Sequence, residues 1–109
     1  YPQNPTEDDK NNYYNFFYNL GYVIPCNKCS KHYRDNLKKY SLKDAVNSKY
    51  EFVNWLINIH NEVNIKNNKK VLSYNEVIEI YNKLYKENKN FFKYLIFIII
   101  LVILYLVFN

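Results

Sequence analysis

The chain contains two cysteines, Cys26 and Cys29, in a Cys-x-x-Cys arrangement that allows a small-loop disulfide. Pro25 precedes them and a helical pattern follows, which predicts that the pair lies at a helix N-terminus. At that position the helix dipole and free backbone N–H groups stabilise a thiolate, and Lys28 and Lys31 add positive charge. Such a pair is suited to accepting electrons and passing them on.

Two other interpretations of the cysteine pair remain open at this point. The pair could be half of a zinc site, for which His32 and His60 are the remaining candidate ligands. The usual spacing of a cysteine pair with a histidine pair, or with a second cysteine pair, is absent. The pair could also form a structural disulfide, which would close only one turn of helix and change the loop entropy little. A thioredoxin-like site would require βαβ segments, and the sequence pattern contains none.

A second group of polar residues lies about 30 residues further along the chain, near Trp55. His60 and Asn64 are four residues apart, so they share one face of a helix, and Asn61 lies beside them. A lone histidine on a half-apolar helix is usually an ordinary core or surface residue. Two asparagines beside it require buried hydrogen-bond partners, which a planar polar ligand would provide.

The elements that must position these groups all show helical periodicity, and no segment shows the alternation of a strand. Thr6 and the acids after it predict a helix from residue 7 to 20, with Gly21 as its C-cap. Pro25 is expected at the first position of a second helix that continues to residue 40, and Ser41 is expected to cap a short turn. A third helix over 49–65, an Asn-rich loop over 67–70 and a fourth helix after Ser73 follow. The soluble part is therefore predicted to be an all-α, small helical bundle.

The apolar positions of these helices indicate which faces are buried. For the first helix they are Tyr13, Phe16, Phe17 and Leu20; for the third, Phe52, Val53, Leu56, Ile59 (or His60) and Val63; for the fourth, Val77, Ile80, Tyr81 and Leu84.

The C-terminal segment is apolar on every side, and residues 94–108 contain no charged side chain. A bundle of roughly 90 residues cannot enclose such a helix, so we expect a transmembrane anchor over 91–108 and a helical domain over 1–88. Lys83, Lys86, Lys89 and Lys93 precede the uncharged run 94–108, and only Asn109 follows it. The positive-inside rule then places the helical domain in the cytoplasm.

Composition excludes several classes of function. The short chain excludes two-domain enzymes, TIM barrels and full dinucleotide-binding domains, and 49% hydrophobic content argues against intrinsic disorder. The net charge of +5 comes from lysines and a single arginine, Arg34. Phosphate-binding surfaces favour arginine, so we expect no nucleic-acid partner.

The two polar groups together resemble the Erv/ALR sulfhydryl oxidases. The resemblance rests on the motif Pro25-Cys26-x-x-Cys29-x-x-His32-Tyr33, followed by Trp55-x4-His60-Asn61-Glu62-Val63-Asn64-x4-Lys69. The segment Tyr1-Pro2-x-x-Pro5-Thr6 also matches the family, and Tyr81 stands where many members have a tryptophan or tyrosine near the cofactor. The resemblance covers roughly residues 1–85 and is greatest to the short members from large DNA viruses, such as mimivirus and the poxviruses.

The resemblance implies a FAD-dependent thiol oxidase built as a helical bundle, usually a homodimer. By this analogy Cys26 is the outer cysteine that exchanges with the substrate, and Cys29 is the inner one beside the flavin. Electrons would pass from a substrate dithiol to the cysteine pair, then to FAD, and then to molecular oxygen, giving hydrogen peroxide. The residues implied to contact FAD are His60, Asn61, Val63, Asn64, Lys69 and Tyr81, with His32 and Tyr33 as further lining residues.

The sequence also departs from the family pattern. Members carry an aromatic-rich helix before the Tyr-Pro segment, so the chain is expected to be N-terminally incomplete, and it has no cysteines for a further disulfide.

A cytoplasmic thiol oxidase suits a large DNA virus that oxidises its virion proteins there, whereas an enzyme in the ER lumen would need an upstream signal. The rival hypotheses are a tail-anchored helical protein that has lost FAD binding, and a small zinc-binding adaptor.

Overall fold

The computed structural model describes residues 1–108, apart from the side chains of 87–90, 107 and 108. Its helices are α1 (Glu7–Val23), α2 (Asn27–Lys39), α3 (Leu42–Ala45), α4 (Lys49–Lys66) and α5 (Tyr74–Phe108), and residues 1–108 contain no strand. This confirms the predicted all-α class. The chain divides into a first unit, residues 1–74, and a second unit that begins at residue 75.

Serine and threonine caps begin three of the helices, as the sequence pattern predicts for α1 and α3. At the start of α1 the Asp9 amide donates to Thr6 Oγ1 (3.1 Å), and the Thr6 amide donates to Asp9 Oδ2 (2.9 Å). The hydrogen bonds from Thr6 hold the pKa of the Asp9 carboxyl below its ordinary value. Ser41 caps α3 and Ser48 caps α4 in the same way. Each cap satisfies an amide that would otherwise have no partner in the first turn.

Gly21 does not end the first helix, so the prediction of a C-cap there is wrong. The helix α1 continues to Val23, and Gly21 is buried inside it. A Cβ atom at this position would lie 3.0 Å from Arg34 Cγ and 3.1 Å from Tyr33 Cδ1. Ser30 Oγ and Arg34 Nη1 donate to the Gly21 carbonyl at 2.6 and 2.8 Å. The glycine therefore allows α2 to approach the α1 backbone closely, which costs some helix propensity.

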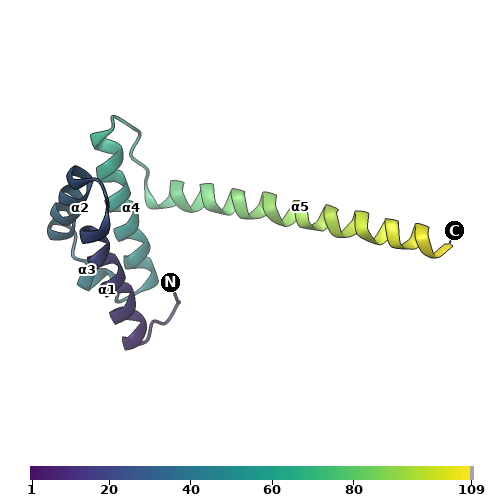
Figure 1. Cartoon of the computed structure of the whole chain (residues 1–109), viewed down its shortest axis with the longest axis horizontal. Helices are drawn as coiled ribbons and strands as arrows, with labels where there is room; N and C mark the ends of the chain where they lie inside the picture. Colours follow the sequence, from purple (N-terminus) through teal and green to yellow (C-terminus); the bar gives the residue numbers. More distant parts are fainter. Residues whose placement is uncertain (109) are drawn as a thin grey trace. The chain divides into compact units, whose positions relative to one another are not determined.

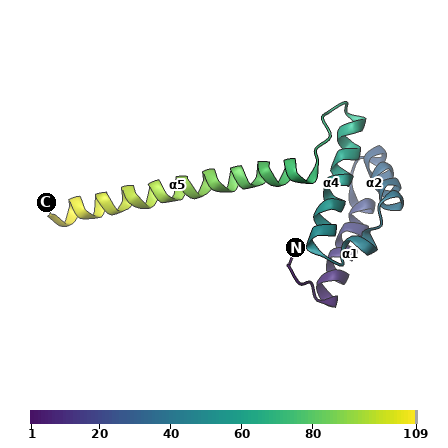
Figure 2. The ribbon, with the colours of Figure 1, turned by 180° about the vertical axis from the view of Figure 1, so that it is seen from behind.

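The first four helices pack into one small bundle. The helix α1 contacts α2 and α3, and α4 contacts the same two helices. Figures 1 and 2, seen from opposite sides, both show α1, α2 and α4 next to one another. The short helix α3 turns the chain between α2 and α4, which brings the polar residues of α4 beside α2.

Aromatic side chains from α1 and α4 form the centre of this bundle. The rings of Phe52 and Trp55 are stacked, with centroids 6.0 Å apart, and Phe17 meets both rings edge-on. Only 3% of Phe52 and 4% of Trp55 is exposed. Trp55 Nε1 donates to the Tyr40 carbonyl at 3.1 Å, so burial leaves the indole N–H paired.

Three of the positions expected to be buried in the first and third predicted helices are exposed. Phe16 is 63% exposed, and Leu56 and Val63 are 36% and 49% exposed. On α1 the buried face follows Tyr13, Phe17 and Gly21, and Phe16 lies one residue off that face. An apolar stripe on an isolated helix thus overestimates the number of residues that a four-helix core can cover.

The chain between α4 and α5 follows the expected Asn-rich loop. Asn68 has a φ of 53°, in the left-handed region that asparagine tolerates better than most residues. The amides of Asn67 and Lys69 donate to the Asn64 carbonyl at 3.1 and 2.8 Å, which closes the end of α4. The prediction of a loop that uses asparagine in place of glycine is confirmed.

The helix α5 joins the expected fourth helix and the apolar tail into one continuous element. Within the described residues it is the one helix long and apolar enough to cross a membrane, over Tyr74–Leu106. An 18-residue window in it has a mean hydropathy of 2.0, and none of that window is buried. Ile80, Tyr81 and Leu84, the expected apolar face of the fourth helix, are about half exposed.

Candidate active site

The two cysteines form a disulfide at the N-terminus of α2. Cys26 is the N-cap residue, and its Sγ accepts a hydrogen bond from the Cys29 amide at 3.2 Å. The helix begins at Asn27, so the prediction that Pro25 occupies the first helical position is wrong: Cys26 takes the extended cap conformation and Pro25 precedes it. The Cys26 and Cys29 Cα atoms are 5.2 Å apart, and both residues are exposed.

This placement gives the disulfide the chemistry of an exchange site. An incoming thiolate can reach either sulfur, and the backbone amides of the first turn stabilise the thiolate that leaves. The two sulfurs are bonded to each other, and the described residues contain no group of three or more His, Cys, Asp or Glu side chains that could hold a metal ion. The geometry thus supports a redox role for the cysteine pair.

A cleft of about 600 Å³ adjoins the disulfide, between α2 and α4. Cys29 lies at its edge, whereas Cys26 is not part of its lining. The remaining lining residues are Ile24, Lys28, His32, Tyr33, Asp35, Asn36, Ile59, Glu62, Val63, Ile65, Lys66 and Asn67. The cleft therefore brings together four of the residues expected at the site: Cys29, His32, Tyr33 and Val63.

Two contacts fix the polar groups that line this cleft. Lys66 Nζ contacts the ring nitrogens of His32, which joins the end of α4 to α2. The Tyr33 hydroxyl donates to the Phe17 carbonyl on α1 at 2.7 Å. Burial raises the pKa of Tyr33 to about 12, so its phenol stays protonated at neutral pH and remains a donor. Lys28 adds a further cation near the sulfurs.

Glu62 links α4 to the end of α2 on the other side of the cleft. Its Oε1 accepts from Lys39 Nζ and from the Tyr40 hydroxyl, both at 2.6 Å. These hydrogen bonds, the one from Lys39 first, lower the pKa of the Glu62 carboxyl. Lys39 is the last residue of α2 and Tyr40 follows it, so the carboxylate connects that end of α2 to the C-terminal part of α4.

The other expected site residues on α4 do not line the cleft. His60 is exposed, and the Asn61 side chain is paired with the backbone of Leu72: its Nδ2 donates to the Leu72 carbonyl (2.8 Å), and its Oδ1 accepts from the Leu72 amide (3.0 Å). Asn64 is 9% exposed, and Lys69 is exposed in the loop after α4. Tyr81 belongs to the second unit, where it is 55% exposed.

The cleft also contains residues that sequence reasoning missed. Ile59 and Lys66 lie four residues before and three residues after Val63, which places all three on one face of α4. Once Val63 was assigned to the site, this helical spacing could have identified both neighbours. Nothing in the sequence indicates that the side chain of Lys66 would reach His32, because the two residues come from different helices.

Comparison with known proteins relates this arrangement to one family. The family model described as the Erv1/Alr family matches residues 1–86. A probable FAD-linked sulfhydryl oxidase of Acanthamoeba polyphaga mimivirus is 51% identical over 84 residues, which cover 76% of this chain and 59% of the relative. A mitochondrial FAD-linked sulfhydryl oxidase of Schizosaccharomyces pombe is 33% identical over 64 residues, covering 59% of this chain and 35% of the relative.

A second viral relative matches a shorter part of the chain. The FAD-linked sulfhydryl oxidase of African swine fever virus is 35% identical over 60 residues, covering 55% of this chain and 49% of the relative. In all three comparisons the match spans less than two thirds of the relative's own length.

Proposed function

Because the chain belongs to the Erv1/Alr family, we propose that it is a FAD-linked sulfhydryl oxidase that forms disulfides in partner proteins. One observation carries the proposal: an exposed disulfide caps α2 and has one of its two sulfurs at the edge of a cleft. An exchange cysteine has to be accessible to protein thiols, and its partner has to face the cofactor. The relatives' names supply the class of enzyme and the cofactor.

The exchange reaction assigns different roles to the two cysteines. A substrate thiolate attacks Cys26 Sγ, the Cys26–Cys29 bond breaks, and Cys29 leaves as a thiolate. The second substrate thiolate then attacks the substrate sulfur of this mixed disulfide, and Cys26 leaves. The substrate has lost two electrons and two protons, and the cysteine pair has become a dithiol. Cys29 lines the cleft and Cys26 does not, which supports Cys29 as the inner cysteine.

The cleft fits FAD by the chemistry of its lining. Ile59 and Val63 provide aliphatic surface and Tyr33 an aromatic ring, as the flat apolar face of an isoalloxazine requires. Lys28 and Lys66 provide positive charge for the anionic part of the cofactor, whereas Asp35 and Glu62 bring the formal charge of the lining as a whole to zero. When bound, FAD supplies an acceptor for the electron pair of the reduced cysteines and a donor to molecular oxygen, which becomes hydrogen peroxide.

We assign two groups of residues to cofactor binding. His32, Tyr33 and Val63 would hold the ring, because they line the cleft with Cys29. The remaining parts of the cofactor would be bound by residues of the family motif and its neighbours, namely His60, Asn61, Asn64, Lys69 and Tyr81. Of these, Asn61 already has a structural partner in Leu72, so its role would be to hold the chain after α4 in place.

The proposal also covers the partners and the location of the enzyme. The substrates of the enzyme are thiol-containing proteins. The enzyme is a homodimer, which sedimentation in detergent would test. The apolar part of α5, residues 91–108, anchors the domain over 1–88 to a membrane. The exposed Lys83 and Lys86 precede that segment and Lys93 lies at its start, which favours a cytoplasmic domain over one in the ER lumen. Protease protection of the domain in sealed membranes would contradict this orientation.

The test is turnover of a small dithiol by the full chain. We expect purified protein supplied with FAD to show flavin absorption and to release hydrogen peroxide when dithiothreitol and oxygen are present. Cys29→Ser should abolish turnover, because no Cys26–Cys29 disulfide is left to accept the electron pair of the dithiol. Asn27→Ser, an exposed change between the cysteines, is the matched control and should keep full activity.

The alternatives give different results in the same preparation. A protein that binds no flavin and makes no peroxide would contradict the oxidase. Stoichiometric zinc without flavin, found by elemental analysis, would favour the adaptor.

A further inference from the structure

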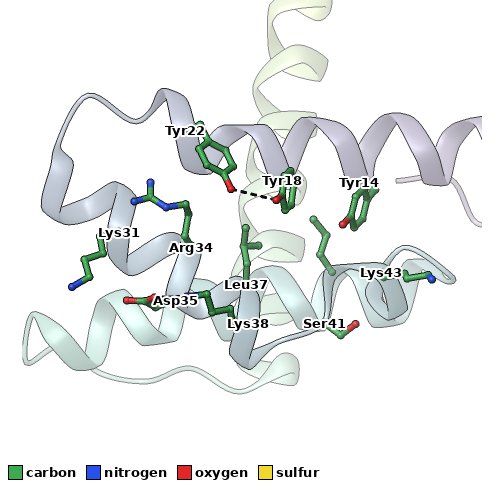
Figure 3. Close-up of a pocket in the computed structure, with 11 residues that line it drawn as sticks. Tyr14, Tyr18, Tyr22, Lys31, Arg34, Asp35, Leu37, Lys38, Ser41 and Lys43 are labelled. Carbon is green, nitrogen blue, oxygen red and sulfur yellow. Dashed lines mark hydrogen bonds and ion pairs between the residues drawn. The ribbon is translucent and has the colours of Figure 1, made fainter.

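A second cleft, of about 680 Å³, lies on the opposite side of α2 from the disulfide cleft. It runs between α1, α2 and the start of α3, and shares only Asp35 with the first cleft. Figure 3 shows Tyr14, Tyr18 and Tyr22 extending from α1 beside α2. We name this cleft the tyrosine–lysine groove, lined by Tyr14, Tyr18, Tyr22, Lys31, Arg34, Asp35, Leu37, Lys38, Ser41, Leu42 and Lys43.

The α1 wall of the groove is a row of three tyrosines spaced four residues apart. The rings of Tyr14 and Tyr18 are stacked with centroids 5.8 Å apart, and those of Tyr18 and Tyr22 are 5.6 Å apart. Tyr18 and Tyr22 are 42% and 60% exposed, and their hydroxyls are 3.3 Å apart. Neighbouring exposed tyrosines of this kind combine apolar area with hydrogen-bonding groups, as protein-binding surfaces do.

The opposite wall is basic. Four cations, Lys31, Arg34, Lys38 and Lys43, face a single carboxylate, Asp35, so the lining has a net charge of +3. Lys38 is paired with Asp35 at 3.3 Å, yet its side chain is 81% exposed, so solvent weakens that pair. The basic wall therefore favours an anionic occupant.

The kinds of cation in the groove indicate which class of anionic ligand it would bind. Arg34 is engaged inside the protein: its Nη1 donates to the Gly21 carbonyl and to Ser30 Oγ, and its guanidinium lies 5.4 Å from the Tyr22 ring centroid. One nitrogen of the bidentate fork that phosphate groups prefer is thus already engaged within the protein. The lysines that remain are point charges spaced along the groove, which suits separate carboxylates on an extended chain.

The groove ends beside the disulfide. Lys31 follows Cys29 by two residues on α2, and Tyr22 lies in the last turn of α1, just before the loop that leads to Cys26. The Ser30 amide donates to the Cys26 carbonyl at 2.8 Å, so the helical turn that carries the sulfurs continues directly into the groove wall. A polypeptide that occupies the groove would therefore have one end next to the exposed sulfurs.

We propose that the tyrosine–lysine groove docks an acidic segment of the protein substrate and so presents a nearby substrate thiol to Cys26. The substrate part of this inference rests on the proposed thiol oxidase function. Docking is then the source of substrate selection: carboxylates of the segment meet Lys31, Lys38 and Lys43, and its apolar side chains pack on the tyrosines.

A binding experiment tests the groove without requiring turnover. The full chain in detergent is titrated into a fluorescein-labelled peptide that contains alternating Glu and Leu residues and has serine in place of cysteine. We expect the peptide to bind about ten times more tightly than its Gln-for-Glu version at low salt, and to lose this advantage as ionic strength rises. Lys38→Glu combined with Lys43→Glu should weaken binding about tenfold. Lys49→Glu, at an exposed position outside the groove, is the control and should bind as wild type does.

The groove assignment would be overturned by equal affinity for the acidic and neutral peptides, or by equal affinity of the double variant and the control. Tighter binding of an oligothymidylate than of the peptide would also overturn it, in favour of a nucleic-acid partner. The fluorescence of Trp55, the only tryptophan, reports whether each variant is folded.

A turnover experiment links docking to catalysis. With a dithiol version of the acidic peptide, the double variant should have a KM raised about tenfold, while its rate with dithiothreitol stays that of wild type. An unchanged KM would overturn presentation to Cys26. If wild type oxidises neither dithiol, the oxidase proposal fails, while the binding titration still decides whether the groove docks an acidic segment.

Discussion

Gly21 gives the most direct test of how α1 and α2 pack. Glycine inside a helix is usually replaced by alanine with a gain of about 1 kcal/mol, because alanine loses less backbone entropy on folding. Here the added methyl group would lie 3.0 Å from Arg34 Cγ and 3.1 Å from Tyr33 Cδ1. The two effects have opposite signs, so the measured change in unfolding free energy decides between them.

The neighbouring side chains have little freedom to move away. Arg34 is held by its bonds to the Gly21 carbonyl and Ser30, and Tyr33 by its 2.7 Å bond to the Phe17 carbonyl. Overpacking of a fixed site costs about 1–3 kcal/mol, and two restrained contacts place Gly21→Ala in the upper part of that range. After subtraction of the propensity gain we expect a net loss of about 1–2 kcal/mol, or roughly 5–15 °C in Tm for a unit of this size.

Fluorescence of the single tryptophan, Trp55, measures this in the full chain, because the residue is buried in the first unit and α5 contributes no signal. Asn19→Ala is the matched control: it lies on an exposed position of α1 and should be neutral or slightly stabilising. In an Arg34→Ala background the cost of Gly21→Ala should shrink, since one of the two close contacts is gone. A Gly21→Ala protein as stable as the Asn19→Ala protein would refute the close-packing role of the glycine.

Three further predictions concern the residues around the site. Asn61→Ala should cost about 1–3 kcal/mol and speed hydrogen exchange of the Leu72 amide, because both of its bonds to Leu72 are lost; unchanged exchange would contradict the structural role. Tyr33 has a pKa of about 12 in the folded protein, above that of an unfolded tyrosine. The contribution of its protonated hydroxyl to the free energy of unfolding is therefore complete below about pH 10 and is lost as the pH rises towards 12. Denaturation curves should therefore show a smaller alkaline loss of stability in Tyr33→Phe than in wild type. Reduction of Cys26–Cys29 should lower stability by no more than about 2 kcal/mol, because the loop is so short, and a larger loss in urea would mean that the disulfide is chiefly structural.

Much of the fold could be predicted from the sequence because its signals are local. Thr6 and Ser41 cap helices where the pattern places them, and the Asn-rich loop places Asn68 in the left-handed region. Gly21 was misassigned because a glycine near a helix end has two physical uses, a left-handed cap and a close approach to another backbone. Only the position of α2 distinguishes them, and that depends on contacts between residues distant in the sequence.

The site could be predicted only in part, for the same reason. The spacing of the cysteines allows the disulfide that the structure shows at the start of α2, and Val63 identifies one wall of the cleft. The family motif on α4 combines residues with different surroundings: Val63 faces the cleft, Asn61 is bonded to Leu72, and His60 is exposed. A motif shows that residues belong together in a family, but it does not show which of them contact the same space.

Tyr33 connects the packing of the bundle to the proposed chemistry. Its ring lies against Gly21, its hydroxyl bonds to the Phe17 carbonyl, and the same side chain lines the cleft beside Cys29. A change that pushes this ring away from α1 must move it towards the cleft or break its hydrogen bond. The contact between α1 and α2 therefore supports one wall of the proposed cofactor site. It follows that close-packing defects at Gly21 should weaken flavin binding under conditions in which the bundle is still folded.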